Sequence, residues 1–281
     1  MNRMTKPLST AGRALALALA ATAVLALASC ETVQTTKPGA VGVERKQFML
    51  LSEAQVDKSA SMAYQDELKK AAKKNALNRD PAQVARVRVM ALRLINVTGA
   101  FRPDAPKWAW ETNVITASDV NAWCMPGGKI AVYTGLIETL KVTDDELAAV
   151  MGHEIAHALR EHGRERASQA YAQAIGLSVV GAAFGLGQGS MQLAQIITEI
   201  TFNLPNSREH EVEADRVGVE LAARAGYDPR AAITLWQKMG QLGGSQPPAF
   251  LSTHPSSKDP QKDLEGYAAR GMPLYEAARK R

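Results

Sequence analysis

Cysteine and histidine are scarce in this chain of 281 residues. Cysteine occurs twice, at Cys30 and Cys124, and histidine five times. After residue 30 there is no apolar run of the roughly 20 residues that a membrane-spanning helix needs, which argues against a protein built into the bilayer. The glycine-rich run Gly185-Leu-Gly-Gln-Gly189 lacks the Lys-Ser/Thr pair of a phosphate loop, which argues against a nucleotide site.

The first 29 residues are predicted to be a signal peptide. Basic residues precede an apolar run from Ala14 to Leu27, which is too short to span a bilayer as a helix. Leu27-Ala-Ser-Cys30 then resembles the lipobox of bacterial lipoproteins, so we expect lipidation of Cys30. An ordinary secretory signal cut nearby is the alternative, and it also exports the protein. Glu31 favours the outer membrane, by resemblance to enteric lipoproteins.

This division of the chain fixes the rest of the expected organisation. Residues 30–50 are mostly polar or small and are expected to tether the lipid to a single domain over residues 51–281. With Cys30 lipidated, Cys124 is the sole remaining thiol, no internal disulfide can form, and a small buried residue is the expected role. Removal of three basic and no acidic side chains with the leader lowers the formal net charge from +5 to +2. Nothing in this charge indicates nucleic-acid binding.

The most informative stretch is His153-Glu-Ile-Ala-His157, inside an alanine-rich apolar run with helical spacing. One helical turn takes 3.6 residues, so His153 and His157 project from the same face and can bind one zinc ion. Glu154 lies about 100° round the helix, where it can reach a water molecule on that metal without being a ligand. The pattern is typical of zinc peptidases, and a solvated helix face is the alternative.

Catalytic zinc normally takes a third protein ligand. A third histidine ten residues after His153 would fall at Gly163, which excludes the metzincin pattern. The remaining candidate segment is Ser207 to Gly218, in which Glu211 and Asp215 are four residues apart and share a helix face. Glu211 can supply the third ligand, and Asp215 can accept a hydrogen bond from the outer nitrogen of a ligand histidine. An exposed acidic helix is the alternative.

Three blocks of the sequence resemble the HtpX-like and CAAX-prenyl-protease family of zinc metallopeptidases, a gluzincin group, and especially its periplasmic lipoproteins. The blocks are Asn121 to Leu136, the His-Glu-x-x-His helix, and Arg208 to Asp215. The resemblance implies a mostly helical α+β, zincin-like metallopeptidase domain that binds one zinc ion. It also implies the ligands His153, His157 and Glu211, and it matches Asp215 to the family's following aspartate.

A small sheet is expected to lie over the metal helix. Trp108 to Ile115 alternates as a strand does, and Pro126-Gly-Gly128 is a turn signal before a second strand. We expect this second strand to pair with an extended substrate backbone. Its residues are Lys129, Ile130, Ala131, Val132, Tyr133 and Thr134.

The metal helix itself has predicted ends. Thr143 and Glu146 form a capping box at its start. We expect the helix to run to about Glu161, with Gly163 as its stop. The largely apolar segments between Gly163 and Asn206 admit three interpretations: a lid or plug over the cleft, plain core, or a membrane-facing patch.

A fourth block, Leu251-Ser-Thr-His254-Pro255, resembles the family's Ser-Thr-His-Pro loop. By that resemblance His254 is either a metal ligand in the resting state or a donor to the reaction intermediate. A turn histidine before proline is the remaining alternative.

These predictions describe a zinc endopeptidase on the periplasmic face of the bacterial outer membrane. The metal would acidify a bound water and polarise the scissile carbonyl, and Glu154 would carry the proton to the leaving amine. The expected substrates are unfolded or misassembled envelope proteins, and outer-membrane assembly machinery is a candidate partner. A chaperone-like lipoprotein with a structural zinc is the alternative, although a structural site needs no general base such as Glu154.

Overall fold

The structure is a computed structural model that describes residues 32–178, 189–242, 248–255 and 260–280. The expected signal peptide and Cys30 lie outside these residues. The described chain is mostly helical with two small sheets, which confirms the expected α+β class. The helices are α2 (Glu53–Lys73), α3 (Pro81–Ile95), α4 (Thr134–Thr139), α5 (Asp144–Leu159), α6 (His162–Ser178), α7 (Gly189–Phe202), α8 (Arg208–Arg224), α9 (Ala231–Gln241), α10 (Ala249–Thr253) and α11 (Pro260–Ala278), with 3-10 turns η1 (Thr98–Ala100) and η2 (Ala105–Lys107).

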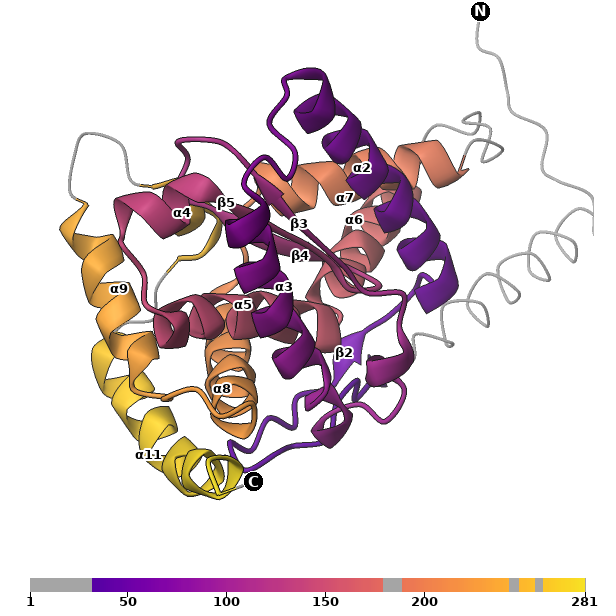
Figure 1. The fold of residues 1–281 in the computed structure, drawn as a ribbon. Coiled ribbons are helices and arrows are strands. Elements are labelled where there is room, and N and C mark those ends of the chain that lie inside the picture. Colours follow the sequence, from indigo (N-terminus) through magenta and orange to yellow (C-terminus); the bar gives the residue numbers. More distant parts are fainter. Residues whose placement is uncertain (1–31, 179–188, 243–247, 256–259, 281) are drawn as a thin grey trace, which may run out of the picture.

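Helix α5 lies at the centre of the molecule, between the larger sheet and α8 (Figure 1). It begins with the predicted capping box, in which the Thr143 hydroxyl accepts from the Glu146 amide and the Glu146 carboxylate accepts from the Thr143 amide. Every residue from Glu146 to Leu159 is buried, so the helix packs on all sides.

The junction after α5 differs from the prediction. The chain turns at Glu161, which has a positive φ of 52°, and Gly163 lies inside α6. The expected stop at Gly163 is therefore wrong. Ion pairs of the Glu161 carboxylate with Arg102 and Arg164 hold this left-handed turn without a glycine.

The larger sheet has the strand order β3-β5-β4, formed by β3 (Glu111–Ile115), β5 (Lys129–Tyr133) and β4 (Ala122–Met125). β5 pairs parallel with β3 and antiparallel with β4, and the predicted turn at Gly127 and Gly128 joins β4 to β5. Both edges of β5 are thus hydrogen-bonded, and Thr134 already belongs to α4. The prediction that Lys129 to Thr134 pairs with substrate is therefore wrong, because a central strand has no free backbone edge. β4 is the edge strand that packs against α5.

Residues 32–48, which we call the N-terminal strap, pack onto the domain. Its two short strands, β1 (Thr32–Val33) and β2 (Gln47–Phe48), pair antiparallel. Between them, Val41 and Val43 are buried in the main apolar core. The expected tether over residues 30–50 and the domain boundary at residue 51 are therefore corrected: the folded domain includes the strap.

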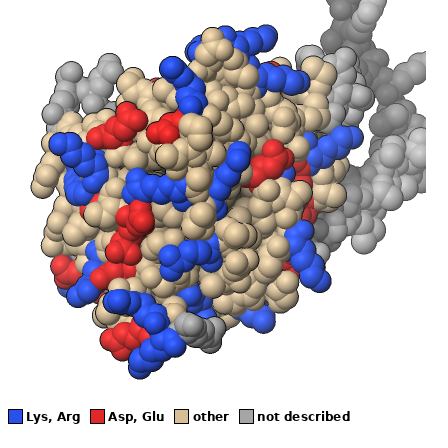
Figure 2. Space-filling model, viewed as in Figure 1, with Lys and Arg blue, Asp and Glu red and all other residues tan. Residues whose placement is uncertain are grey.

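Helices α6 and α7 contribute to a second apolar cluster beside α2. Ala167 of α6 and Leu193, Ile197 and Ile200 of α7 are buried in it. Of the three interpretations of this region, packing in the core is therefore correct for the buried faces of α6 and α7. Residues 179–188, between the two helices, lie outside the described residues. Within the described part of the chain, no helix has the length and apolarity to cross a membrane. Basic and acidic side chains are interspersed across the face shown in Figure 2.

Helices α5 and α8 cross in direct backbone contact. A Cβ atom on Gly218 would lie 2.7 Å from the backbone nitrogen of His153, and one on Gly152 would lie 2.8 Å from the Gly218 carbonyl oxygen. Such contacts are too short for any side chain, so only glycine fits at both positions. The crossing brings the predicted carboxylates of α8 to the histidines of α5.

We expect Gly218→Ala to destabilise the protein by about 1–3 kcal/mol, because the added methyl group must push two backbones apart. Denaturant unfolding measures this. Gly240→Ala on α9 is the matched control, since a Cβ there meets nothing within 4 Å; it should be neutral or stabilising by up to about 1 kcal/mol. A Gly218→Ala protein as stable as wild type would contradict the close crossing.

Candidate metal centre

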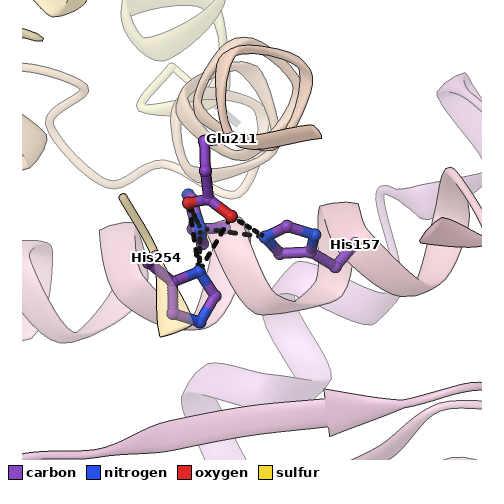
Figure 3. A group of neighbouring side chains, drawn as sticks. His157, Glu211 and His254 are labelled. Carbon is purple, nitrogen blue, oxygen red and sulfur yellow. Dashed lines mark hydrogen bonds and ion pairs between the residues drawn. The ribbon is translucent and has the colours of Figure 1, made fainter. Parts of the chain in front are cut away.

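Four buried side chains from three helices converge beside the α5–α8 crossing: His153 and His157 of α5, Glu211 of α8 and His254 at the end of α10. Figure 3 shows how His157, Glu211 and His254 point toward one another. The candidate ligand atoms of the four residues all lie within 4.8 Å of one another. The Nε2 atoms of His153 and His157 are 3.1 Å apart. Oε2 of Glu211 lies 3.3 Å from Nε2 of His153, and Oε1 lies 3.4 Å from Nε2 of His157.

These spacings fit a tetrahedral metal ion. Metal–nitrogen bonds of about 2.0–2.1 Å place the corners of a tetrahedron roughly 3.3 Å apart. The fourth donor, Nδ1 of His254, lies 3.2 Å from His153 Nε2 and 3.1 Å from Glu211 Oε2. Three imidazoles and one carboxylate therefore present donor atoms at the spacing that a zinc-sized ion requires.

Asp215 fixes the orientation of one of these rings. Its Oδ1 lies 2.9 Å from Nδ1 of His153, the nitrogen that faces away from the cluster. The Nδ1–H group donates to the carboxylate, which leaves Nε2 unprotonated and aimed at the other donors. The structure thus gives Asp215 the partner that its spacing from Glu211 predicts.

Glu154 lies beside the cluster without joining it. It is buried, its Oε1 is 3.5 Å from Nε2 of His254, and that oxygen has no hydrogen-bond partner in the described structure. Burial raises the pKa of this carboxyl above its ordinary value. A carboxylate with a raised pKa and a free oxygen is suited to move a proton in the cleft. Burial likewise raises the pKa of the Cys124 thiol, which is no activated nucleophile.

The electrostatics of the cluster favour a cation. Burial alone would lower the pKa of His153, but hydrogen bonds to Asp215 and Glu211 outweigh it and raise that pKa well above its usual value. Burial would raise the pKa of Glu211, but the neighbouring imidazoles lower it well below its usual value. Burial lowers the pKa of His157 to about 3, so this ring is a neutral ligand at physiological pH. The buried carboxylates thus favour positive charge at this site, and a bound cation would take the place of the proton on His153.

Two alternatives left open by the sequence are excluded by burial. His254 is 6% exposed and its ring stacks on Phe250 at 4.2 Å, so it is not a turn histidine at the surface. Glu211 and Glu213 are buried, and of the acidic residues in these turns Glu209 alone is largely exposed, so α8 is not a solvated acidic helix.

Sequence reasoning missed two histidines of this region. His162 lies 2.8 Å from His157, measured between their Nδ1 atoms, and its ring stacks on His210 at 4.3 Å. All five histidines of the chain are therefore buried in one neighbourhood. The sequence could have indicated this, because each of the five histidines lies within or next to a block that resembles the family.

A narrow cavity of about 60 Å³ adjoins the cluster, with room for a few water molecules. Trp123 and Cys124 of the edge strand β4 line it together with Glu154, and so do Ile200 and Thr201 of α7. The edge strand thus borders the candidate general base. Helix α7 forms a wall of the same cavity, in addition to its place in the core.

The model of Peptidase family M48 matches residues 81–268, which include the whole cluster. Metalloprotease LoiP of Escherichia coli is 28% identical over 246 residues, which cover 87% of this chain and 92% of LoiP. Metalloendopeptidase OMA1, mitochondrial, of Homo sapiens is 32% identical over 248 residues, which cover 83% of this chain and 44% of that protein. Mitochondrial metalloendopeptidase OMA1 of Arabidopsis thaliana is 42% identical over 156 residues, which cover 56% of this chain and 31% of that protein. The chain spans less than half the length of these OMA1 relatives.

We expect Glu211→Ala to abolish stoichiometric metal binding, because the site loses its only ligand from α8 and its negative charge. Metal content of the purified protein after dialysis measures this. Glu209→Ala removes an exposed carboxylate from the same helix and should leave metal content unchanged. Stoichiometric zinc in Glu211→Ala would remove Glu211 from the ligand set.

Proposed function

The chain belongs to peptidase family M48, and on that premise we propose that it is a zinc-dependent endopeptidase that cleaves unfolded or misassembled proteins of the bacterial cell envelope. The observation that carries the proposal is the pairing of a three-donor cluster, His153, His157 and Glu211, with a buried carboxylate, Glu154, that stays outside it. Two histidines and one glutamate are a known ligand set of catalytic zinc. A purely structural site has no need of a further buried carboxylate with a free oxygen.

The roles of the chain's own residues follow from their positions. His153, His157 and Glu211 would hold the zinc ion, which when bound supplies a Lewis acid for the scissile carbonyl and lowers the pKa of the attacking water. Glu154 accepts the proton of that water and delivers it to the leaving amine. Asp215 keeps the His153 ring in the tautomer that presents Nε2.

His254 is proposed as a ligand of the resting state. Its Nδ1 stands at the fourth corner of the cluster, where a catalytic site keeps a place for water or substrate. Activity then requires this ring to leave. The other role expected for His254, a donor to the reaction intermediate, is the alternative.

Substrates are proposed to bind as extended backbone along β4. This strand pairs with β5 on one edge, and its residues Trp123 and Cys124 line the cavity beside Glu154. Main-chain pairing tolerates many side chains and requires an unfolded segment, which fits misassembled envelope proteins as substrates. The cavity is too small for a peptide, so α7 or His254 must move to admit one.

The proposed location is the periplasmic face of the outer membrane, where a lipid on Cys30 would anchor the chain. The support is the sequence of the leader and the Leu27-Ala-Ser-Cys30 block. Outer-membrane assembly machinery is the proposed partner at that location. Mass spectrometry that finds a mature N-terminus other than a lipidated Cys30 would refute the anchoring.

We expect Glu154→Gln to retain zinc and to cut casein at least about 100-fold more slowly than wild type, since the amide cannot accept the proton. Proteolysis and metal content are measured on the same preparation. Glu138→Gln, an exposed acid on α4, is the control and should cut at the wild-type rate. Cleavage by Glu154→Gln at the wild-type rate would exclude the mechanism.

The same variant separates the proposal from a non-proteolytic chaperone that contains zinc. If the Glu154→Gln protein corrects the envelope defects of a strain that lacks this chain, binding of client proteins without cleavage is sufficient and the chaperone alternative holds. The protease proposal requires that it does not.

We expect His254→Ala to raise the rate of casein cleavage several-fold while zinc stays bound, because three ligands remain and the fourth corner opens. Initial rates at matched zinc content measure this. A fall in rate with unchanged zinc content would assign His254 the donor role alone.

A further inference from the structure

The outer nitrogen of the ligand His157 faces a second histidine. Nε2 of His157 is turned to the cluster, 3.1 Å from His153 Nε2. Nδ1 lies 2.8 Å from Nδ1 of His162, the first residue of α6. Both rings are buried, so no bulk water competes for this contact.

The contact determines where the protons lie. When His157 presents the lone pair of Nε2 to a metal, its proton is on Nδ1, and that N–H donates to His162. Nδ1 of His162 must then be unprotonated, so the His162 proton is on Nε2. Nε2 lies 3.0 Å from Oε2 of Glu213 and donates to that carboxylate. The relay from His157 through His162 to Glu213 therefore has one consistent arrangement of protons.

The far end of the relay is fixed by two arginines. Nε of the fully buried Arg160 donates to Oε2 of Glu213 at 2.9 Å, and Nε of Arg45 donates to Oε1 at 2.7 Å. Arg45 also donates through both terminal nitrogens to Glu165, at 2.6 and 2.8 Å. Glu213 is therefore held in place by two guanidinium groups, as an acceptor for His162 must be.

The N-terminal strap supplies one of these arginines. Arg45 precedes strand β2, and its carbonyl accepts from the Arg160 guanidinium at 2.9 Å. Gln47, two residues on, donates from Nε2 to the Arg160 carbonyl at 2.6 Å and to Glu165 at 2.8 Å. The strap thus contacts Glu213 of the relay through the Arg45 side chain. It also contacts Arg160 and Glu165, through the Arg45 carbonyl and the Gln47 side chain.

We propose that His162 is a positioning residue for the metal ligand His157, and that the N-terminal strap, through Arg45 and Glu213, fixes the relay and so strengthens metal binding. The inference rests on the proposed metal site, but it concerns affinity for the ion and not cleavage. A buried histidine with a purely structural role would also be hydrogen-bonded, but it need not accept from the outer nitrogen of a ligand histidine.

Metal affinity of the full mature chain tests the proposal. Apo protein is titrated with Co²⁺ and with Zn²⁺ against a chelator, and the visible spectrum of the Co²⁺ form reports ligand geometry. His162→Leu removes the acceptor for His157 at similar volume, and we expect its dissociation constant to rise about 10- to 100-fold, as for other partners of ligand histidines. His162→Asn keeps an acceptor oxygen near the position of Nδ1, so it should recover most of the affinity and the wild-type spectrum.

Ser168→Ala is the matched control, because Ser168 is also fully buried on α6 and loses a hydrogen bond, here from the Leu51 amide. It should lower the melting temperature and leave the dissociation constant within about threefold of wild type. Arg45→Met should weaken metal binding by about tenfold, and wild-type affinity in this variant would overturn the role of the strap.

Equal loss of affinity in His162→Leu and His162→Asn, or wild-type affinity in both, would overturn the positioning role. If His162→Leu fails to fold, His162→Asn decides alone, since it must bind metal within about tenfold of wild type. These readouts do not use proteolysis. A negative result for the relay would therefore not affect the test of Glu154 as the general base. Cleavage by Glu154→Gln, in turn, would not affect the proposal that His162 strengthens metal binding.

Discussion

The backbone contact between α5 and α8 is the constraint on which the metal centre depends. Gly152 and Gly218 meet where the helices cross, and His153 follows directly after the first of them. Asp215 and Glu211 lie about one and two turns before Gly218 on α8, so they face the imidazoles. The separation of carboxylate from imidazole is thus set by two backbones in contact and not by flexible side chains. The donor atoms are consequently held at metal-binding distance by the core, so binding requires little reorganisation.

The same crossing buries many charges, and these are balanced in two different ways. A buried carboxylate costs several kcal/mol unless it is paired. Behind the cluster, Glu213 and Glu165 are paired with Arg160, which directly follows α5, and with Arg45 of the strap, so that region is neutralised by the chain itself. At the cluster, Glu211 and Asp215 face imidazoles that must be neutral to act as ligands. A divalent cation bound by the neutral imidazoles would balance the charge of these carboxylates.

The sequence predicted what local spacing determines. Histidines four residues apart, carboxylates four residues apart and the capping box at Thr143 each depend on one helix, and the structure places each as expected. Strand order was not predictable in this way, because β5 becomes central only by pairing with β3, which lies before β4 in the chain. The strap was missed for a related reason. Its composition is polar, and what ties it to the domain is Arg45, whose partners lie 120 and 168 residues away.

The four donor side chains differ in how many buried contacts would be lost if they moved. This difference determines which donor can leave the cluster to admit water or substrate. His153, His157 and Glu211 stand on the central helices α5 and α8, and moving any of them would break the glycine crossing or the relay behind His157. His254 ends a helix of five residues and is held by its stack on Phe250 and a backbone bond to that same residue. Withdrawal of His254 therefore disturbs the fewest buried contacts. The resting and catalytic states proposed above would then share one rigid set of three ligands, with the exchange confined to the fourth corner.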